Sequence, residues 1–115
     1  MLKALFAAVD RMDTEAFAGY LSDGCRFRFG NQAPVVGLDP IKSYIGGFFR
    51  SLQGLHHEIT ESWPVSDGIV CHGVVNYTRH DGSQLQVPFC NLLKIHDGKI
   101  TEYLIFADNS ALYLN

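Results

Sequence analysis

Asp108 is the carboxylate whose position in this sequence most directly suggests chemistry. It follows the apolar run from Tyr103 to Ala107, so it must either reach solvent or occupy a cavity. In a cavity, loss of hydration would raise the pKa of the carboxyl group and let it exchange a proton with a substrate. We therefore predict that Asp108 is a catalytic acid or base. The alternative is that Asp108 only orders the turn at Asn109 and Ser110.

Asn91 is the second catalytic candidate, because it interrupts the apolar stretch from Val87 to Leu93. A buried amide must be paired, and its NH2 group can donate a hydrogen bond to a substrate oxygen. The alternative is that Asn91 pairs only with neighbouring backbone or a buried water.

His57 is the third catalytic candidate. It follows His56, and strand alternation sends the two side chains to opposite faces, so at most one enters a pocket. An imidazole titrates near neutral pH, so His57 can orient Asp108 or act as a base. No second ligand stands at a recognisable spacing, so we expect no metal site.

Four further residues are predicted to bind a ligand. Tyr44 and Trp63 present an apolar body with one hydrogen-bonding atom, although core packing is the alternative for both. Phe89 shares a strand face with Asn91. Asn76 belongs to a polar strand face that is directed either to a cavity or to a partner subunit.

The composition limits the class of protein. The chain has 115 residues, 47% of them hydrophobic and 18% charged, and a formal net charge of -3. This length and apolar content predict one globular domain spanning residues 1–115. The scattered cations disfavour nucleic acid or an anionic membrane as a partner and favour a small, weakly charged ligand. No run of residues is long and apolar enough to span a bilayer, and no signal peptide is recognisable.

Several kinds of catalytic and cofactor site are missing from the sequence. It contains no GxSxG, Walker, GxGxxG or HExxH motif, and we expect no cofactor. The three cysteines lack CxxC spacing and are odd in number, so we expect reduced thiols and a cytoplasmic location.

The first half of the chain predicts helices. Leu2, Leu5, Phe6 and Val9 have the spacing of one helical face, and Asp13 is placed to cap a second helix. Residues 25–29 alternate as a short strand, and residues 31–37 read as a loop. A third helix is expected to begin at Asp39–Pro40 and to run to about residue 52.

The second half predicts a sheet. Four β-like runs cover residues 55–65, 69–79, 84–95 and 99–106, separated by three Asp–Gly turns at 67–68, 81–82 and 97–98. Helices followed by hairpin-connected strands indicate an α+β fold with a mainly antiparallel sheet.

Residues 13–17 (DTEAF), 27–31 (FRFGN), 37–39 (GLD) and 96–108 (HDGKITEYLIFAD) resemble stretches of SnoaL-like polyketide cyclase relatives, within the nuclear transport factor 2-like (NTF2-like) superfamily. The resemblance covers almost the whole chain. It implies a cone in which three helices pack on a curved sheet around a pocket. It also places Asp108 where SnoaL-like cyclases carry their acid or base, and Asn91 where ketosteroid isomerases carry an acidic oxyanion-hole residue.

Two functions follow as expectations. The first is a cofactor-independent isomerase, cyclase or lyase acting on a small hydrophobic carbonyl compound, in which Asp108 moves the proton. The alternative is a non-catalytic module that binds an apolar metabolite or acts as a dimeric adaptor. We also expect a homodimer, because Val75, Tyr77 and Leu92 would expose apolar area on the convex sheet face.

Overall fold

The computed structural model describes residues 1–113. Three helices precede or interrupt the strands: α1 (Leu2–Asp10), α2 (Thr14–Ala18) and α3 (Leu38–Arg50). The strands are β1 (Leu21–Phe29), β2 (Val35–Val36), β3 (Gly54–Val65), β4 (Gly68–Thr78), β5 (Gln84–His96) and β6 (Lys99–Phe106), and a 3-10 helix, η1 (Ser110–Tyr113), follows. The predicted α+β class is confirmed.

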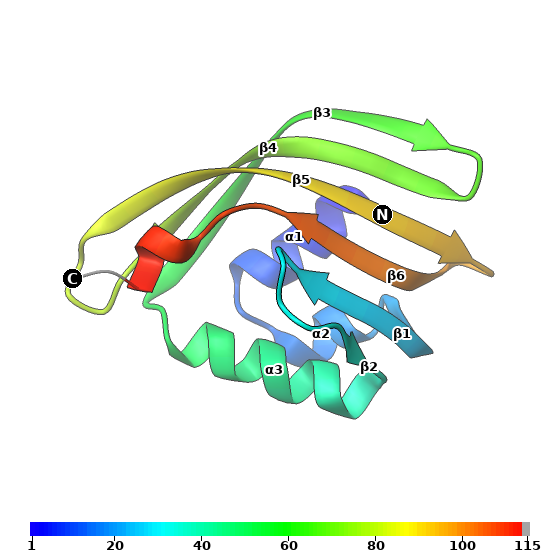
Figure 1. Cartoon of the computed structure of the whole chain (residues 1–115), viewed down its shortest axis with the longest axis horizontal. Helices are drawn as coiled ribbons and strands as arrows, with labels where there is room; N and C mark the ends of the chain where they lie inside the picture. The colour runs from blue at the N-terminus through cyan, green and yellow to red at the C-terminus, as the bar shows by residue number, and fades with distance from the viewer. Residues whose placement is uncertain (114–115) are drawn as a thin grey trace.

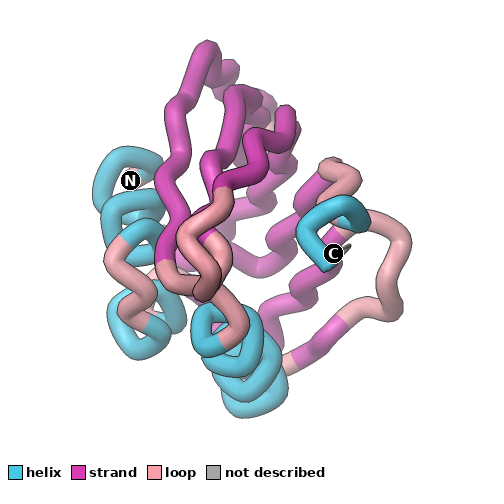
Figure 2. Tube along the Cα trace, turned by 90° about the vertical axis from the view of Figure 1, so that its left-hand side faces the viewer, coloured by secondary structure: helices cyan, strands magenta, loops and turns pink. Residues whose placement is uncertain are grey.

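All six strands form one sheet in the order β2-β1-β6-β5-β4-β3. The segment from β3 to β6 is an antiparallel meander, as the sequence predicts, whereas β1 pairs with β6 in parallel. The long strands arch over the helices, with α3 lying beneath the concave side (Figure 1). Viewed from the side, α1 and α2 close one flank of this arch and η1 lies at the other (Figure 2).

The helix starts follow local chemistry. The side chain of Asp13 accepts a hydrogen bond from the Ala16 N–H at 3.0 Å, so the predicted cap of α2 is confirmed. Helix α3 begins at Leu38, two residues before Pro40, the predicted first helical residue, and ends at Arg50, two residues before the predicted end. Its N-cap is Gly37 with φ of 97°, and Asp39 lies in the first turn without capping it.

The strand boundaries agree with the Asp–Gly turns. Asp97 and Gly98 both have positive φ, at 51° and 75°, as expected for a tight hairpin between β5 and β6. The predicted strand at 25–29 instead begins at Leu21, and the predicted loop contains the short strand β2.

The core lies between the concave sheet face and the three helices. Its largest fully buried side chains include Leu5, Phe17, Phe27, Ile41 and Leu93. Val75 and Tyr77 also face this core and are 2% and 3% exposed, so their predicted place on the convex face is wrong. Among residues 1–113, no helix is long and apolar enough to cross a membrane.

Candidate functional site

A cavity of about 40 Å³ lies inside the cone, between the concave sheet face and the helices. Most of its wall is aromatic or aliphatic, and the aromatic residues are Phe17, Phe27, Phe29, Tyr44, Phe48, Phe49, Tyr77, Phe89 and Tyr103. Among the polar groups in this wall are the side chains of His57 and Asn91. A volume of this size admits about three water molecules. The cavity therefore suits a very small ligand, or a larger one that displaces side chains.

Asp10 and His57 form a close polar pair, and His57 is the member that lines the cavity. The Nδ1 atom of His57 lies 2.6 Å from Oδ1 of Asp10, and the backbone N–H of His57 donates to Oδ2 at 3.0 Å. The two side chains are 11% and 19% exposed for His57 and Asp10 respectively. The end of α1 is thereby fastened to the start of β3 by a carboxylate that also touches the exposed His56.

This contact decides the chemistry of the imidazole. An ionised carboxylate only accepts hydrogen bonds, so Nδ1 of His57 carries the hydrogen, and in the neutral imidazole Nε2 has the lone pair. Among the described residues, the His57 side chain makes a hydrogen bond through Nδ1 and none through Nε2. An imidazole oriented by a carboxylate, with its second nitrogen unpaired, is the arrangement of a general base.

Two phenyl rings hold the imidazole in place. Phe6 of α1 lies 4.8 Å from the His57 ring, centroid to centroid, and Phe89 of β5 lies 5.2 Å away with its ring nearly perpendicular. Such packing fixes the ring plane, so the direction of Nε2 is set by both the carboxylate and the two rings.

Asn91 and Tyr103 form a second polar group deeper in the wall. Burial raises the pKa of the Tyr103 hydroxyl, and a hydrogen bond from the Asn91 side chain partly opposes that rise. Tyr103 therefore stays protonated near neutral pH and can donate a hydrogen bond. Asn91 is only 2% exposed, and its Oδ1 atom has no hydrogen-bond partner among the described residues.

Tyr44 stands at the other side of the cavity. Its ring packs on Phe27 and its hydroxyl donates to Oε1 of Gln32 at 2.6 Å. Gln32 is exposed, so this hydrogen bond ties the cavity wall to a surface loop.

The structure brings four of the seven predicted site residues to the cavity: His57, Asn91, Tyr44 and Phe89. It places Trp63 and Asn76 elsewhere. Trp63 is 43% exposed and stacks on His72, 5.4 Å between centroids, on the outer sheet face. Asn76 shares that face and accepts a hydrogen bond from Gln86, so it has no access to the cavity.

Asp108 does not have the environment that its predicted role requires. It is exposed, and it accepts a hydrogen bond from the Ser110 N–H at 3.0 Å at the start of η1. Hydrogen bonds from Ser110 lower the pKa of Asp108, whereas a raised pKa was expected. The expectation of desolvation is wrong because the chain leaves the sheet after Phe106 and carries Asp108 outward.

Sequence reasoning missed Asp10 and Tyr103. A signal for Asp10 was present, because Leu2, Phe6 and Asp10 follow each other at four-residue spacing and therefore share the buried face of α1. A carboxylate on an apolar stripe needs a partner, and His57 is that partner. The sequence around Tyr103 is typical of an apolar strand and does not mark this residue. Only the sheet register brings Tyr103 beside Asn91.

The fold and the site together define an α+β cone with an apolar cavity, and the wall of this cavity includes His57, which is paired with Asp10. A family model described as a SnoaL-like domain matches residues 2–103, and the chain belongs to that family. Comparison with curated proteins gives no match.

Solved structures with the same fold share little sequence with this chain. TerC co-crystallised with polyporic acid is 19% identical, with 97% of this chain and 92% of that chain covered and a TM-score of 0.84. An NTF2-like protein of unknown function from Burkholderia pseudomallei is 14% identical over 96% and 90%, with a TM-score of 0.86. A putative SnoaL-like polyketide cyclase from Jannaschia sp. CCS1 is 18% identical over 96% and 85%, with a TM-score of 0.83. These likenesses show the fold.

Proposed function

We propose that this protein catalyses proton transfer on a small hydrophobic carbonyl compound, with His57 as the base and no cofactor. The observation that carries this proposal is the 2.6 Å contact of His57 Nδ1 with Asp10 beside an apolar cavity. The reaction class is the isomerase, cyclase or lyase chemistry expected from the sequence. The proton-moving group is assigned to His57 in place of Asp108.

The proposed first step is removal of a proton next to the carbonyl group. Nε2 of His57 takes the proton from carbon, and the electron pair of the broken C–H bond moves into the carbonyl to give an enolate. Asp10 stabilises the resulting imidazolium. The neutral Tyr103 hydroxyl donates to the enolate oxygen, and Asn91 orients Tyr103.

The second step returns the proton and sets the product. The N–H of the imidazolium delivers its proton to the same carbon, to another carbon of the conjugated system, or to a leaving hydroxyl group. The apolar wall excludes water, which strengthens the hydrogen bond to the enolate oxygen.

The relatives give modest support for a small ligand. TerC was crystallised with polyporic acid, and the Jannaschia protein is described as a putative SnoaL-like polyketide cyclase. Both have the same fold as this chain, whose cavity has the apolar wall that a small organic ligand needs.

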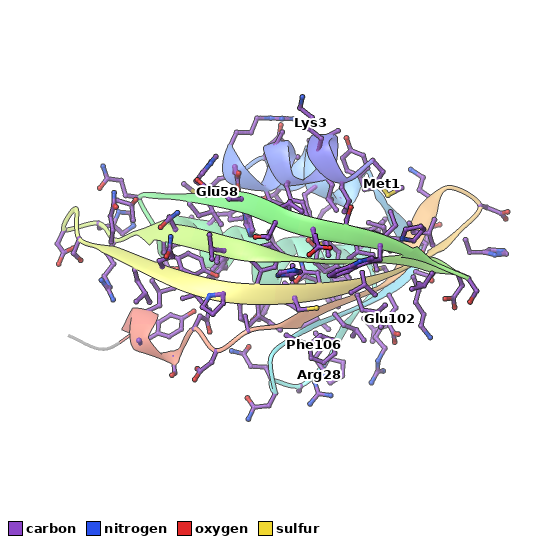
Figure 3. The ribbon with its side chains drawn as sticks, turned by 90° about the horizontal axis from the view of Figure 1, so that it is seen from above. Met1, Lys3, Arg28, Glu58, Glu102 and Phe106 are labelled. Atoms are coloured by element: carbon purple, nitrogen blue, oxygen red, sulfur yellow. The ribbon has the colours of Figure 1, made fainter. Side chains whose placement is uncertain are left out.

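The proposal includes a homodimer formed through the outer sheet face. The strand register places Val70, Leu92 and Leu104 side by side across β4, β5 and β6. Two residues further along the same face, Cys90 of β5 pairs with Phe106 of β6. We call Trp63, Val70, Cys90, Leu92, Leu104 and Phe106 the outer patch. Phe106 is 57% exposed, and it projects from the outer face shown in Figure 3.

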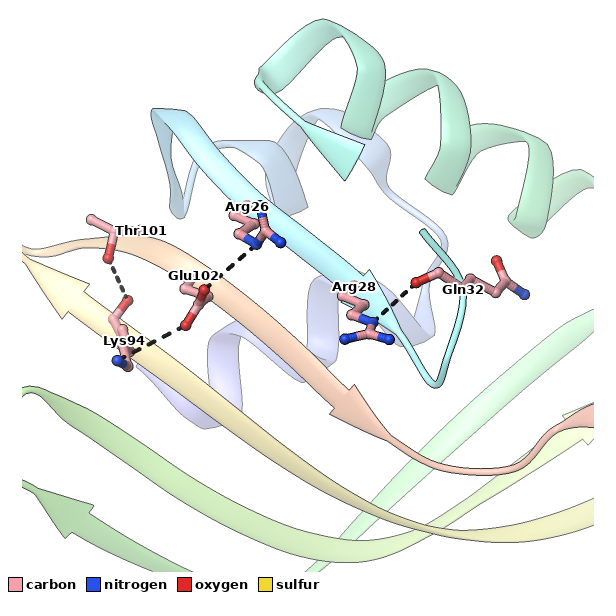
Figure 4. A network of polar contacts seen from close by, with 6 residues as sticks. All are labelled: Arg26, Arg28, Gln32, Lys94, Thr101 and Glu102. Carbon is pink, nitrogen blue, oxygen red and sulfur yellow. Dashed lines mark hydrogen bonds and ion pairs between the residues drawn. The ribbon is translucent and has the colours of Figure 1, made fainter. Parts of the chain in front are cut away.

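Charged residues border the outer patch and would form the rim of such an interface. Glu102 lies 3.8 Å from Arg26 and 4.0 Å from Lys94, which joins β1, β6 and β5 on this face (Figure 4). An apolar centre with a charged rim is the usual anatomy of a protein interface. A two-fold symmetric dimer would cover the outer patch of one copy with the outer patch of the other.

The proposed chemistry is tested by hydrogen–deuterium exchange. Small ketones such as butanone and cyclohexanone are incubated in D2O with the protein, and loss of the α-proton signal is followed by NMR. We expect protein-dependent exchange that falls about 100-fold or more in His57→Gln. His96→Gln is the matched control, because His96 is 80% exposed and lies far along β5. Equal exchange in wild type and His57→Gln would refute the proposal.

A further inference from the structure

The unpaired oxygen of Asn91 places a requirement on the ligand that the proposed chemistry alone does not. Asn91 Oδ1 is a buried acceptor in the cavity wall without a partner among residues 1–113. Leaving a buried acceptor unpaired is costly, so the protein gains most from a ligand that supplies a donor there.

The neighbouring groups do not remove this need. Tyr103, the diagonal neighbour of Asn91 across β5 and β6, also lines the cavity, and no hydrogen bond joins its hydroxyl group to Asn91 Oδ1. The Tyr103 hydroxyl hydrogen remains available for a carbonyl oxygen of the ligand.

The cavity therefore offers three different contacts. His57 Nε2 accepts, the Tyr103 hydroxyl donates, and Asn91 Oδ1 accepts. A simple ketone satisfies only the Tyr103 hydroxyl and leaves Asn91 Oδ1 unpaired. A ketone with a hydroxyl group satisfies both Tyr103 and Asn91, because a hydroxyl group supplies the missing hydrogen.

The spacing of Asn91 and Tyr103 also limits where that hydroxyl sits. Leu93 pairs with Tyr103 and Asn91 pairs with Ile105, so the two side chains are diagonal neighbours on β5 and β6. Since diagonal neighbours on one face of a sheet lie within reach of each other, a carbonyl and a hydroxyl that contact both side chains must be close together on the ligand.

We infer that the ligand of this cavity is a small hydroxyketone whose hydroxyl group lies one or two carbons from the carbonyl and donates to Asn91 Oδ1. This inference rests on the proposed function for its carbonyl group and adds the hydroxyl. It also separates this chain's ligand from plain apolar ketones of equal size.

Hydroxyacetone and butanone test the inference, because they have the same number of heavy atoms and differ by a hydroxyl in place of a methyl group. Dissociation constants are measured by NMR titration of ¹⁵N-labelled protein. Wild type should bind hydroxyacetone more tightly, because a site built to hydrogen-bond a hydroxyl rejects the analogue lacking it. Asn91→Leu, which has similar volume and no acceptor, should shift the ratio of the two constants toward butanone by about tenfold or more.

Asn76→Leu is the matched control, since Asn76 is an asparagine on the outer face of the neighbouring strand. The ratio of the hydroxyacetone and butanone dissociation constants should be the same for Asn76→Leu as for wild type. Methoxyacetone, which keeps the oxygen but lacks the hydrogen, should bind wild type no better than butanone does.

The outcomes separate the two proposals. Equal binding of hydroxyacetone and butanone by wild type overturns the hydroxyl requirement and leaves the base role of His57 standing. Preference for hydroxyacetone together with undiminished exchange in His57→Gln supports the hydroxyl requirement and refutes the proposed chemistry. Binding of neither compound at millimolar concentration overturns both.

Discussion

His57 shows how much of this site depends on single neighbours. Asp10 determines which ring nitrogen carries the hydrogen, and Phe6 and Phe89 determine the plane of the ring. Without Asp10, the imidazole would lose its preferred tautomer although the cavity wall would remain. Geometry and protonation are therefore set by different residues, and substitutions can separate them.

Asp10→Asn should lower α-proton exchange of a bound ketone by about tenfold or more while leaving ketone affinity nearly unchanged. The amide keeps the size of the carboxylate but no longer stabilises an imidazolium. Exchange rates and NMR-derived dissociation constants on the same samples check this. A variant that loses affinity and exchange equally would point to a structural role for Asp10.

Asp108→Asn should leave exchange within about twofold of wild type, because Asp108 is exposed and its carboxylate is engaged by Ser110. The same NMR assay measures it. A large loss of exchange would return Asp108 to the role that the sequence suggested.

The two buried cysteines predict a pH dependence. Burial raises the pKa of Cys25 and Cys71 to about 11, from an ordinary value of 9.0. In the unfolded chain these thiols ionise from about pH 9, whereas the folded protein keeps them protonated. Their contribution to stability is therefore complete below pH 9 and is lost as the pH rises toward 11.

Urea unfolding at pH 8, 9.5 and 10.5 measures this loss, and a thiol reagent at pH 8 should modify at most Cys90 in the folded protein. Rapid modification of two or three thiols in native conditions would contradict the burial of Cys25 and Cys71.

At the scale of elements, an irregularity in strand β3 explains why Trp63 does not line the cavity as the sequence suggested. Simple alternation puts His57 and Trp63 on the same face, because they are six residues apart. The pairing of β3 with β4 shifts between Ile59 and Glu61, and one extra residue reverses the alternation. Trp63 therefore turns to the outer face, and no sequence pattern in β3 marks the residue at which this happens.

Glycine at position 73 accommodates the same irregularity. A Cβ atom there would overlap the carbonyl oxygen of Glu58 on β3. Gly73→Ala should destabilise the protein by about 3 kcal/mol or more, since backbone must move. Gly54→Ala, on the same strand pair, meets no atom within 4 Å and should change stability by less than about 1 kcal/mol. Urea denaturation compares them, and equal effects would show that the bulge tolerates a side chain.

Much of the element pattern could be predicted because it depends on local chemistry. Asp–Gly turns and the Asp13 cap act within a few residues, so both were visible in the sequence. The parallel pairing of β1 with β6 joins segments about 75 residues apart, for which no local signal exists. The contact between Asp10 and His57 is of the same kind, and its partners became visible only in the folded chain.

At the scale of the molecule, one sheet serves two purposes. Its concave side lines the cavity, and its convex side carries the outer patch. The register that sends Asn91 inward sends Leu92 outward, so the site and the proposed interface are fixed by the same strand pairing.

Leu104→Glu should convert the proposed homodimer to a monomer, because it places a charge in the centre of the outer patch. Val36→Glu is the control, since Val36 is 53% exposed on the far edge strand β2. Size-exclusion chromatography with light scattering at micromolar concentration measures the mass. A monomeric wild type would refute the homodimer.

The central claim is that Asp10 holds His57 with its hydrogen on Nδ1 and a free lone pair on Nε2. Long-range ¹H–¹⁵N NMR of the histidine rings tests it most directly at neutral pH, with the exposed His96 as an internal reference. We predict that His57 shows a protonated Nδ1 and an unprotonated Nε2, and that Asp10→Asn abolishes this preference. A hydrogen on Nε2 of His57, or a mixture of its two tautomers, would contradict the assignment of His57 as the base.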